Sequence, residues 1–331
     1  MANSKKEWVK IFLLVVISIS LTFLILELSF RVFCPVNFYS FISHSTKSWT
    51  DADVILNRQA VRISRTLGYE WVPNVQKGWL RTNSLGMYDR QRQKYKPPGT
   101  YRIICLGDST TANSDYVRML EALLNRGEQR YEVWNCAVTG YNLIQYCRAL
   151  KEKWIKFDPD MVIIGFCLND FTPTPLVVKE DNRIVGYFPD EEVLPAVNPF
   201  LLKHSALYRF IAAKLFFSKN VDYSEKMIQT SRAYLRQTKD LLSAKNARFL
   251  IVILGLTKRF EENPKTWRDN YVQIKQIIND YSINSLDTVP LFQQNNPESL
   301  MLHDELHFNQ KGSTIVAETI YAYLKQKLKK E

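Results

Sequence analysis

The chain is predicted to form an α/β fold with helices on both faces of a parallel sheet. From Tyr101 onward, short runs with strand character alternate with longer helix-like runs, the pattern of successive βα units. The strand-like runs are short and buried-looking, as expected of parallel strands covered on both faces. Three of them end in small polar clusters, and functional groups of open α/β sheets gather beyond the carboxyl ends of strands.

The first element is an N-terminal apolar segment. No charge occurs from Ile11 to Leu26, and only Lys10, Glu27 and Arg31 interrupt the apolar character between Trp8 and Phe33. This length is sufficient to cross the hydrocarbon layer of a membrane. Residues 11–33 are therefore expected to form a transmembrane signal anchor.

Charges before this segment predict its orientation. Lys5, Lys6 and Lys10 favour a short cytoplasmic N-terminus, residues 1–10, with the rest of the chain on the extracytoplasmic side of the cell (inner) membrane. A cleaved signal peptide is the alternative. No small-x-small cleavage site follows, however, and Arg31-Val-Phe-Cys34 is too bulky to be one.

An extension and a main domain follow. Residues 34–98 are expected to pack on the main domain, and Lys96-Pro-Pro-Gly99 marks the boundary. Residues 99–331 form the predicted α/β domain, interrupted by an insertion at 171–222 that contains a hairpin around Asp181-Asn182. Strands are predicted at Tyr101–Leu106, Tyr131–Asn135, Asp160–Phe166 and Ala247–Leu254. Helices are predicted at Tyr116–Arg126, Leu143–Lys156, Ser224–Ala244, Trp267–Tyr281 and Ser313–Lys330.

Composition argues against two other classes of protein. With 331 residues, 46% of them hydrophobic, the chain can bury a full core. The net charge of +11 raises the possibility of nucleic-acid binding, but Lys and Arg are scattered apart from the C-terminal tail. The five cysteines follow no metal-ligand spacing. A bridge between Cys136 and Cys167 is conceivable and stays open.

Four polar clusters carry the chemistry. Gly107-Asp-Ser-Thr110, Asn135-Cys-Ala-Val-Thr-Gly140 and Gly165-Phe-Cys-Leu-Asn-Asp170 each follow a predicted strand, and Asp304-Glu-Leu-His307 precedes the last helix. Because carboxyl ends of parallel strands meet at one edge of a sheet, the first three are expected to face one crevice.

These clusters supply each part of a serine nucleophile system. Ser109 needs a base of near-neutral pKa, and His307 is the best placed of four histidines. Asp304, three residues away, can orient that imidazole. The backbone N–H groups of Ser109 and Gly140 and the side-chain amide of Asn169 can serve as an oxyanion hole. Asp108 and Asp170 are expected to fix the turns beside these residues.

On these clusters the chain resembles the SGNH (GDSL-type) hydrolases, in the bacterial branch tethered by one N-terminal membrane helix. The family's marker residues would be Ser109, Gly140, Asn169 and His307, with Asp304 completing the triad. The resemblance implies a flavodoxin-like three-layer α/β/α sandwich and no cofactor. One departure is Cys167, where the family commonly has glycine; its bulkier side chain is expected to narrow the site.

The sequence argues against two rival site chemistries. His303 and His307 are spaced as in the zinc motif His-Glu-x-x-His, but Phe308-Asn-Gln-Lys-Gly312 favours a turn where that motif needs a continuous helix. The Gly-x-Ser-x-Gly motif of α/β-hydrolases does not occur, nor do the dinucleotide and phosphate-loop fingerprints.

The sequence thus predicts an exported, membrane-anchored serine esterase that hydrolyses or transfers an O-linked acyl group. The expected substrate is an acylated glycan of the cell envelope, acetate being one candidate acyl group; this rests on the resemblance and the anchor. A lipid or thioester hydrolase with the same triad is an alternative. A catalytically silent protein that binds or scaffolds envelope polysaccharide assembly is another. No metal and no nucleic acid is expected.

Overall fold

The computed structural model describes residues 2–33, 61–64, 66–77, 80–171, 176–180, 183–188, 198–216, 224–255, 264–303 and 307–328. The chain divides into two compact units. One comprises Met1–Asp51 with Pro175–Asp222, and the other comprises Ala52–Thr174 with Tyr223–Glu331. Each unit is described by itself below.

A five-stranded parallel sheet is the centre of the second unit. Its strands are β5 (Thr100–Gly107), β6 (Arg130–Asn135), β7 (Met161–Phe166), β10 (Arg248–Ile253) and β11 (Asn284–Asp287). They lie in the order β11-β10-β7-β5-β6, and every neighbouring pair is parallel. Renumbered along the chain this is the order 2-1-3-4-5 of flavodoxin-like folds. The predicted fold class is confirmed.

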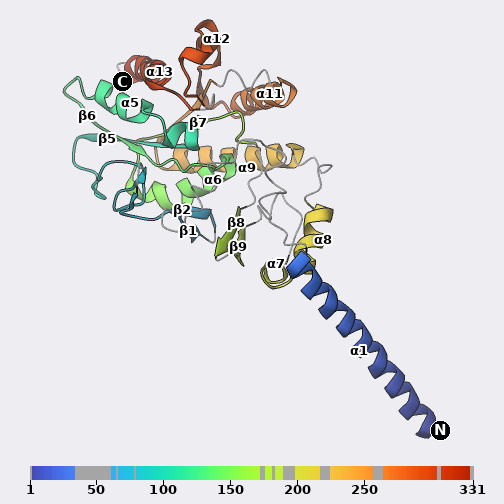
Figure 1. The fold of residues 1–331 in the computed structure, drawn as a ribbon. Coiled ribbons are helices and arrows are strands. Elements are labelled where there is room, and N and C mark those ends of the chain that lie inside the picture. The colour runs from blue at the N-terminus through green and yellow to red at the C-terminus, as the bar shows by residue number, and fades with distance from the viewer. Residues whose placement is uncertain are drawn as a thin grey trace. The chain divides into compact units, whose positions relative to one another are not determined.

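Helices cover both faces of the sheet. Figure 1 shows α5 (Tyr116–Leu124) and α13 (Gln310–Leu328) together on one side, and α6 (Leu143–Ala149) and α9 (Ser224–Ala244) on the other. The remaining helices of this unit are α4 (Ser109–Ala112), α11 (Pro264–Asp280) and α12 (Val289–Gln294). The result is the three-layer sandwich that the resemblance implied.

Alternate residues of the strands point to the same face of the sheet and form an apolar core with the helices on that face. Ile103 and Cys105 of β5 and Ile163 of β7 join Leu120 of α5 and Ile320 of α13 in one apolar cluster. All six residues of β7 are buried, because this central strand is covered on both faces. The site therefore rests on the least exposed part of the sheet.

Some elements differ from the prediction. β11 and α4 were not predicted. Residues 143–156 were predicted as one helix, but α6 ends at Ala149 and passes into a π-helical turn, Leu150–Trp154, and a 3₁₀ turn, Ile155–Phe157. Cys136 and Cys167 are both free and buried, so no disulfide joins them.

The extension ahead of the sheet covers the edge strand β6. It contributes β1 (Val61–Ser64) paired with β2 (Gly68–Trp71), and β3 (Gln76–Lys77) paired with β4 (Leu80–Arg81). Further along, Asp89 accepts the Asn135 N–H at 3.1 Å, and Glu121 of α5 accepts the Val133 N–H at 3.1 Å. These are outward-facing donors of β6 that a neighbouring strand would otherwise bind.

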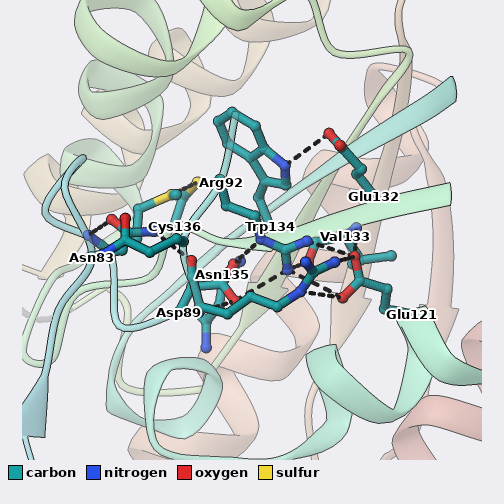
Figure 2. Close-up of polar contacts among 12 residues, drawn as sticks. Asn83, Asp89, Arg92, Glu121, Glu132, Val133, Trp134, Asn135 and Cys136 are labelled. Carbon is teal, nitrogen blue, oxygen red and sulfur yellow. Dashed lines mark hydrogen bonds and ion pairs between the residues drawn. The ribbon is translucent and has the colours of Figure 1, made fainter. Parts of the chain in front are cut away.

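Arg92 joins the two carboxylates into one network. Figure 2 shows its guanidinium between Asp89 and Glu121, at 2.8 Å and 2.6 Å, with a third bond of 2.6 Å to the Val133 carbonyl. Burial alone would raise the pKa of Glu121, but the hydrogen bonds and charge of Arg92 hold it below its ordinary value. The edge of the sheet is thus closed by side chains and by one buried arginine.

The first unit holds the N-terminal helix. Helix α1 (Ala2–Phe33) contains a stretch, Lys6–Phe33, that is long and apolar enough to cross a membrane, with a mean hydropathy of 2.7 over an 18-residue window. The other elements are β8 (Leu176–Glu180) paired antiparallel with β9 (Arg183–Phe188), α7 (Pro199–His204) and α8 (Ala206–Phe216). The predicted hairpin is present as β8 and β9, while Asp181 and Asn182 themselves lie outside the described residues.

Candidate active site

Ser109 lies at the turn between β5 and α4. The preceding Asp108 is extended, with φ −89° and ψ −153°, and its carboxylate accepts the Thr110 N–H at 2.8 Å as the N-cap of α4. Ser109 is therefore the first residue of the helix, and its exposed fraction is 7%. The serine is held at a strand-to-helix corner beyond the carboxyl end of the sheet.

Two glycines let this corner sit close to the sheet. Gly107 of β5 and Gly165 of β7 are register partners. A Cβ atom at Gly107 would lie 2.2 Å from the Thr111 Oγ1, and one at Gly165 would lie 2.4 Å from the same atom. Because neither contact is possible, only glycine at both positions lets α4 pack at the point where the strand order reverses.

The second cluster runs beside the end of β5. The Val138 N–H donates to the Gly107 carbonyl at 3.0 Å, so the chain leaving β6 continues past the end of its neighbour. Gly140 has φ +80°, a conformation that L side chains rarely adopt. From β2, the Tyr69 hydroxyl donates to the Thr139 carbonyl and the Trp71 indole to the Ala137 carbonyl. The extension thereby supports the turn that presents Gly140.

The third cluster is ordered by Asp170. Its carboxyl accepts the Cys167 N–H at 2.8 Å and the Tyr146 hydroxyl at 2.6 Å. This closes the turn after β7 on which Asn169 lies. The Cys167 side chain is fully buried and accepts a hydrogen bond from Thr110 at 3.5 Å, so it packs under α4.

His307 comes from a chain reversal ahead of α13. Met301 pairs antiparallel with Phe308, and the Leu302 N–H donates to the His307 carbonyl at 2.7 Å. His307 is buried, whereas His303 is exposed. The two histidines therefore lie on opposite arms of a reversal, a different arrangement from the helical zinc motif. In the parts of the chain that the structure describes, no three His, Cys, Asp or Glu side chains form a metal-binding group.

Asp108 connects these segments. Its carboxylate is hydrogen-bonded by the Asn169 side chain and lies within electrostatic range of His307. Burial raises the pKa of Asp108, although the Thr110 N–H, the His307 charge and the Asn169 amide all act to lower it. An asparagine amide has two N–H donors, so one remains available when Asp108 accepts the other.

The structure therefore brings Asn169 and His307 to the residue directly before Ser109, and links the Gly140 segment to the same strand end. Asp304 lies outside the described residues. The sequence did not predict the hydrogen bond of Asp108 with Asn169 or its electrostatic interaction with His307; the only signal was its place immediately before the serine at a strand end. From the sequence, Asp108 is expected only to fix the turn beside Ser109.

Comparison with known proteins decides the family. The model of the GDSL-like lipase/acylhydrolase family matches residues 105–315, nearly two thirds of the chain. The chain belongs to this family. The matched residues include all four polar clusters, and the family is one of ester hydrolases. No curated protein sequence matches the chain.

Solved structures similar to this GDSL-like hydrolase share little sequence with it. A lipase/acylhydrolase from Enterococcus faecalis is 14% identical over 69% of this chain and 96% of its own, with a TM-score of 0.45. A catalytic mutant of the acetylxylan esterase Axe2 from Geobacillus stearothermophilus is 16% identical over 68% and 93%, with a TM-score of 0.44. A GDSL-like lipase from Bacteroides thetaiotaomicron is 12% identical over 68% and 88%, with a TM-score of 0.40.

Proposed function

We propose that this GDSL-like hydrolase is a membrane-anchored, extracytoplasmic serine esterase that removes an O-linked acetyl group from a cell-envelope glycan. The observation that supports the proposal is the surroundings of Asp108, next to Ser109: the Asn169 side chain hydrogen-bonds its carboxylate, and His307 lies within electrostatic range of it. We assign the roles of nucleophile, base and amide donor to Ser109, His307 and Asn169, which come from three segments far apart in the chain.

In the proposed mechanism, the Ser109 Oγ attacks the acyl carbon while its proton passes to His307. Asp304 orients the imidazole and stabilises its charged form. The Ser109 and Gly140 N–H groups and the second N–H of the Asn169 amide bind the oxyanion, each contributing about 3 kcal/mol. The alcohol leaves with the proton of His307, and water then releases the acyl group by the same steps in reverse order.

The substrate class rests on family and place. The family acts on esters, and the anchor would keep the enzyme at the envelope, where glycans carry ester-linked acyl groups. One of the similar solved structures is an acetylxylan esterase; at its low identity, this motivates a choice of test substrates and nothing more. Transfer of the acyl group to another hydroxyl instead of water uses the same residues.

The test is hydrolysis of p-nitrophenyl esters by the full chain in detergent. We expect Ser109→Ala and His307→Ala each to lower kcat by about 10⁴-fold or more. Ser285→Ala, at an exposed serine of β11, is the matched control and should retain activity. Full activity in Ser109→Ala would refute the nucleophile, and an inactive native protein would favour the scaffold alternative.

Chain length of the acyl group separates the substrate classes. The proposal expects p-nitrophenyl acetate to be cleaved faster than the octanoate, and acetate to be released from an acetylated glycan. Preference for the octanoate or for a thioester would instead support the lipid or thioester hydrolase.

A further inference from the structure

The end of α1 binds the start of α8. The Glu27 carboxylate accepts the Ala206 N–H at 2.8 Å, the Leu207 N–H at 3.0 Å and the Ser205 hydroxyl at 2.8 Å. The first N–H groups of a helix have no partner within the helix, and the positive end of its dipole favours a negative charge. Glu27, a residue of α1, therefore caps the N-terminus of α8. Glu27 and Ser205 are 178 residues apart in the chain.

Arg31 completes this contact, one turn further along α1. It pairs with Glu27 at 2.8 Å and donates to the carbonyl of His204, the last residue of α7, at 2.7 Å. Phe30 contacts Phe210 of α8, with ring centroids 4.6 Å apart. Figure 1 shows α7 and α8 beside this end of α1. One turn of α1 thus binds the junction of α7 and α8. The negative Glu27 accepts from the first N–H groups of α8, and the positive Arg31 donates to the last carbonyl of α7.

The position of Glu27 along α1 sets the depth of that junction. Sixteen uncharged residues, Ile11–Leu26, separate Lys10 from Glu27. At 1.5 Å per residue they span about 24 Å, about 6 Å less than the hydrocarbon layer of about 30 Å, a difference that the charged side chains at the two ends cover by reaching toward the headgroups. Lys10 and Glu27 therefore fall near the two headgroup layers, and the α7–α8 junction bound to Glu27 falls in the outer one.

The two helices expose apolar side chains at this level. Phe200 of α7 is 67% exposed, Leu201 is 38% exposed, and Ile211 of α8 is 41% exposed. Large apolar side chains held at the boundary between headgroups and acyl chains gain free energy by entering the lipid.

We propose that α7 and α8 form a lipid-binding element that lies in the outer headgroup layer, clamped to the anchor by Glu27 and Arg31. The proposal rests on the anchoring that is part of the proposed function. The occupant is lipid because α1 is itself exposed along its apolar length and needs lipid around it, and the α7–α8 surface continues from its end. Along the chain, the insertion that carries these helices follows β7, the strand that leads to Asn169.

The test uses the full chain, in a Cys34→Ser background, reconstituted into vesicles of phosphatidylcholine and phosphatidylglycerol. A fluorophore is attached to a single new cysteine in Phe200→Cys or Ile211→Cys. Quenching by a lipid with a nitroxide near the glycerol end of its acyl chain is compared with quenching by aqueous iodide. We expect both probes to be quenched by the lipid and protected from iodide.

Two reference positions keep the outcomes distinguishable. A probe at Leu13→Cys, within α1, reports the anchor alone, and one at Val272→Cys, on an exposed position of α11, reports water. If lipid quenches the probe at position 13 but iodide quenches the probes at positions 200 and 211, this proposal is overturned and the membrane anchor stands. An iodide-exposed Leu13 probe would overturn both. Shielding of Phe200 and Ile211 from both quenchers would mean that protein covers them, which also contradicts the proposal.

A second comparison tests the clamp. Glu27→Ala should lower lipid quenching of the Ile211 probe by about twofold or more while the Leu13 probe is unchanged. Glu7→Ala is the matched control. It removes an exposed carboxylate near the other end of α1, for which the structure gives a pairing with Lys10. Equal quenching in Glu27→Ala and Glu7→Ala would refute the role of Glu27.

Discussion

Asn169 illustrates how one residue serves two partners in the proposed site. Its amide hydrogen-bonds Asp108, which fixes the plane of the amide and so the direction of the second N–H. We expect Asn169→Ala to lower kcat by about 10²-fold with little change in KM, because an oxyanion donor acts in the transition state. Steady-state kinetics on p-nitrophenyl acetate measures this. Asn295→Ala, at an exposed asparagine, should behave as the native protein; an equal loss in both variants would contradict the assignment.

Asp170 carries a pH dependence of stability. Burial raises the pKa of its carboxyl well above the ordinary value, and the charge of Asp108 adds to the rise. Between the pKa of an unfolded aspartate, about 4, and the higher folded value, the folded state binds more protons than the unfolded state. The free energy of unfolding therefore decreases as pH rises through that window.

Replacing the Asp170 carboxyl by an amide removes its contribution to the decrease of the free energy of unfolding with rising pH. We expect Asp170→Asn to be more stable relative to the native protein at pH 8 than at pH 5, judged by urea unfolding midpoints. The amide oxygen can still accept the Cys167 N–H, so the turn is retained. A stability difference that is the same at both pH values would show that Asp170 ionises normally in the folded protein.

At the scale of elements, the edge strand β6 depends on the buried Arg92. Its side chain is 3% exposed and pairs with both Asp89 and Glu121. Removing one partner of a buried ionic network leaves charges uncompensated, so Arg92→Met should lower the free energy of unfolding by about 3–5 kcal/mol. Arg90 binds the same Glu121 but its side chain is 64% exposed, and Arg90→Met should cost about 1 kcal/mol or less. Equal costs in urea unfolding would refute the edge-closing role.

The loop of His307 depends on Asn309. Its side-chain oxygen accepts the Lys311 and Gly312 N–H groups at the start of α13, and its amide donates to the Ser299 and Met301 carbonyls at 2.8 Å and 3.1 Å. One residue thus caps the helix and ties down the arm that pairs with Phe308.

Substitution can separate these two tasks. Asn309→Ser keeps an N-cap oxygen and loses the amide donors, whereas Asn309→Ala loses both. We expect Ala to cost about 1 kcal/mol more than Ser in unfolding free energy, and both to reduce kcat because His307 is no longer held. Native kcat in Asn309→Ser would show that the ties to Ser299 and Met301 do not position the base.

At the scale of the whole molecule, most of the sheet could be predicted from the sequence because its central strands contain continuous apolar runs, at residues 103–106, 161–166 and 249–253. β11 could not, since Asn-Ser-Leu-Asp has one apolar residue and lies at an edge, half exposed. α4 is a single turn too short to be predicted; besides its local Asp108 cap, it depends on close packing against Gly165 of β7, which is distant in sequence. The closure of β6 by Asp89 and Glu121 likewise depends on partners distant in sequence.

The residues of the candidate site also fall into those that could be predicted from the sequence and those that could not. Ser109, Gly140 and Asn169 could be placed from sequence because the carboxyl ends of parallel strands meet at one edge of a sheet. The role of Asp108 could not, because its partners come from three separate segments. The catalytic roles of Ser109, His307 and Asp304 and the oxyanion roles of the Ser109 and Gly140 N–H groups and the Asn169 amide remain predictions. The extent of the extension 34–98 and the anchor of residues 11–33 also remain predictions.

The central claim is that Ser109 is the nucleophile, and covalent labelling tests it most directly. The full chain is treated with a fluorophosphonate, digested, and the modified residue is located by mass spectrometry. We predict one adduct, on Ser109, that is absent in His307→Ala because the serine then lacks its base. Native folding of that variant is checked by circular dichroism. An adduct on another residue, or undiminished labelling in Ser109→Ala, would contradict the account.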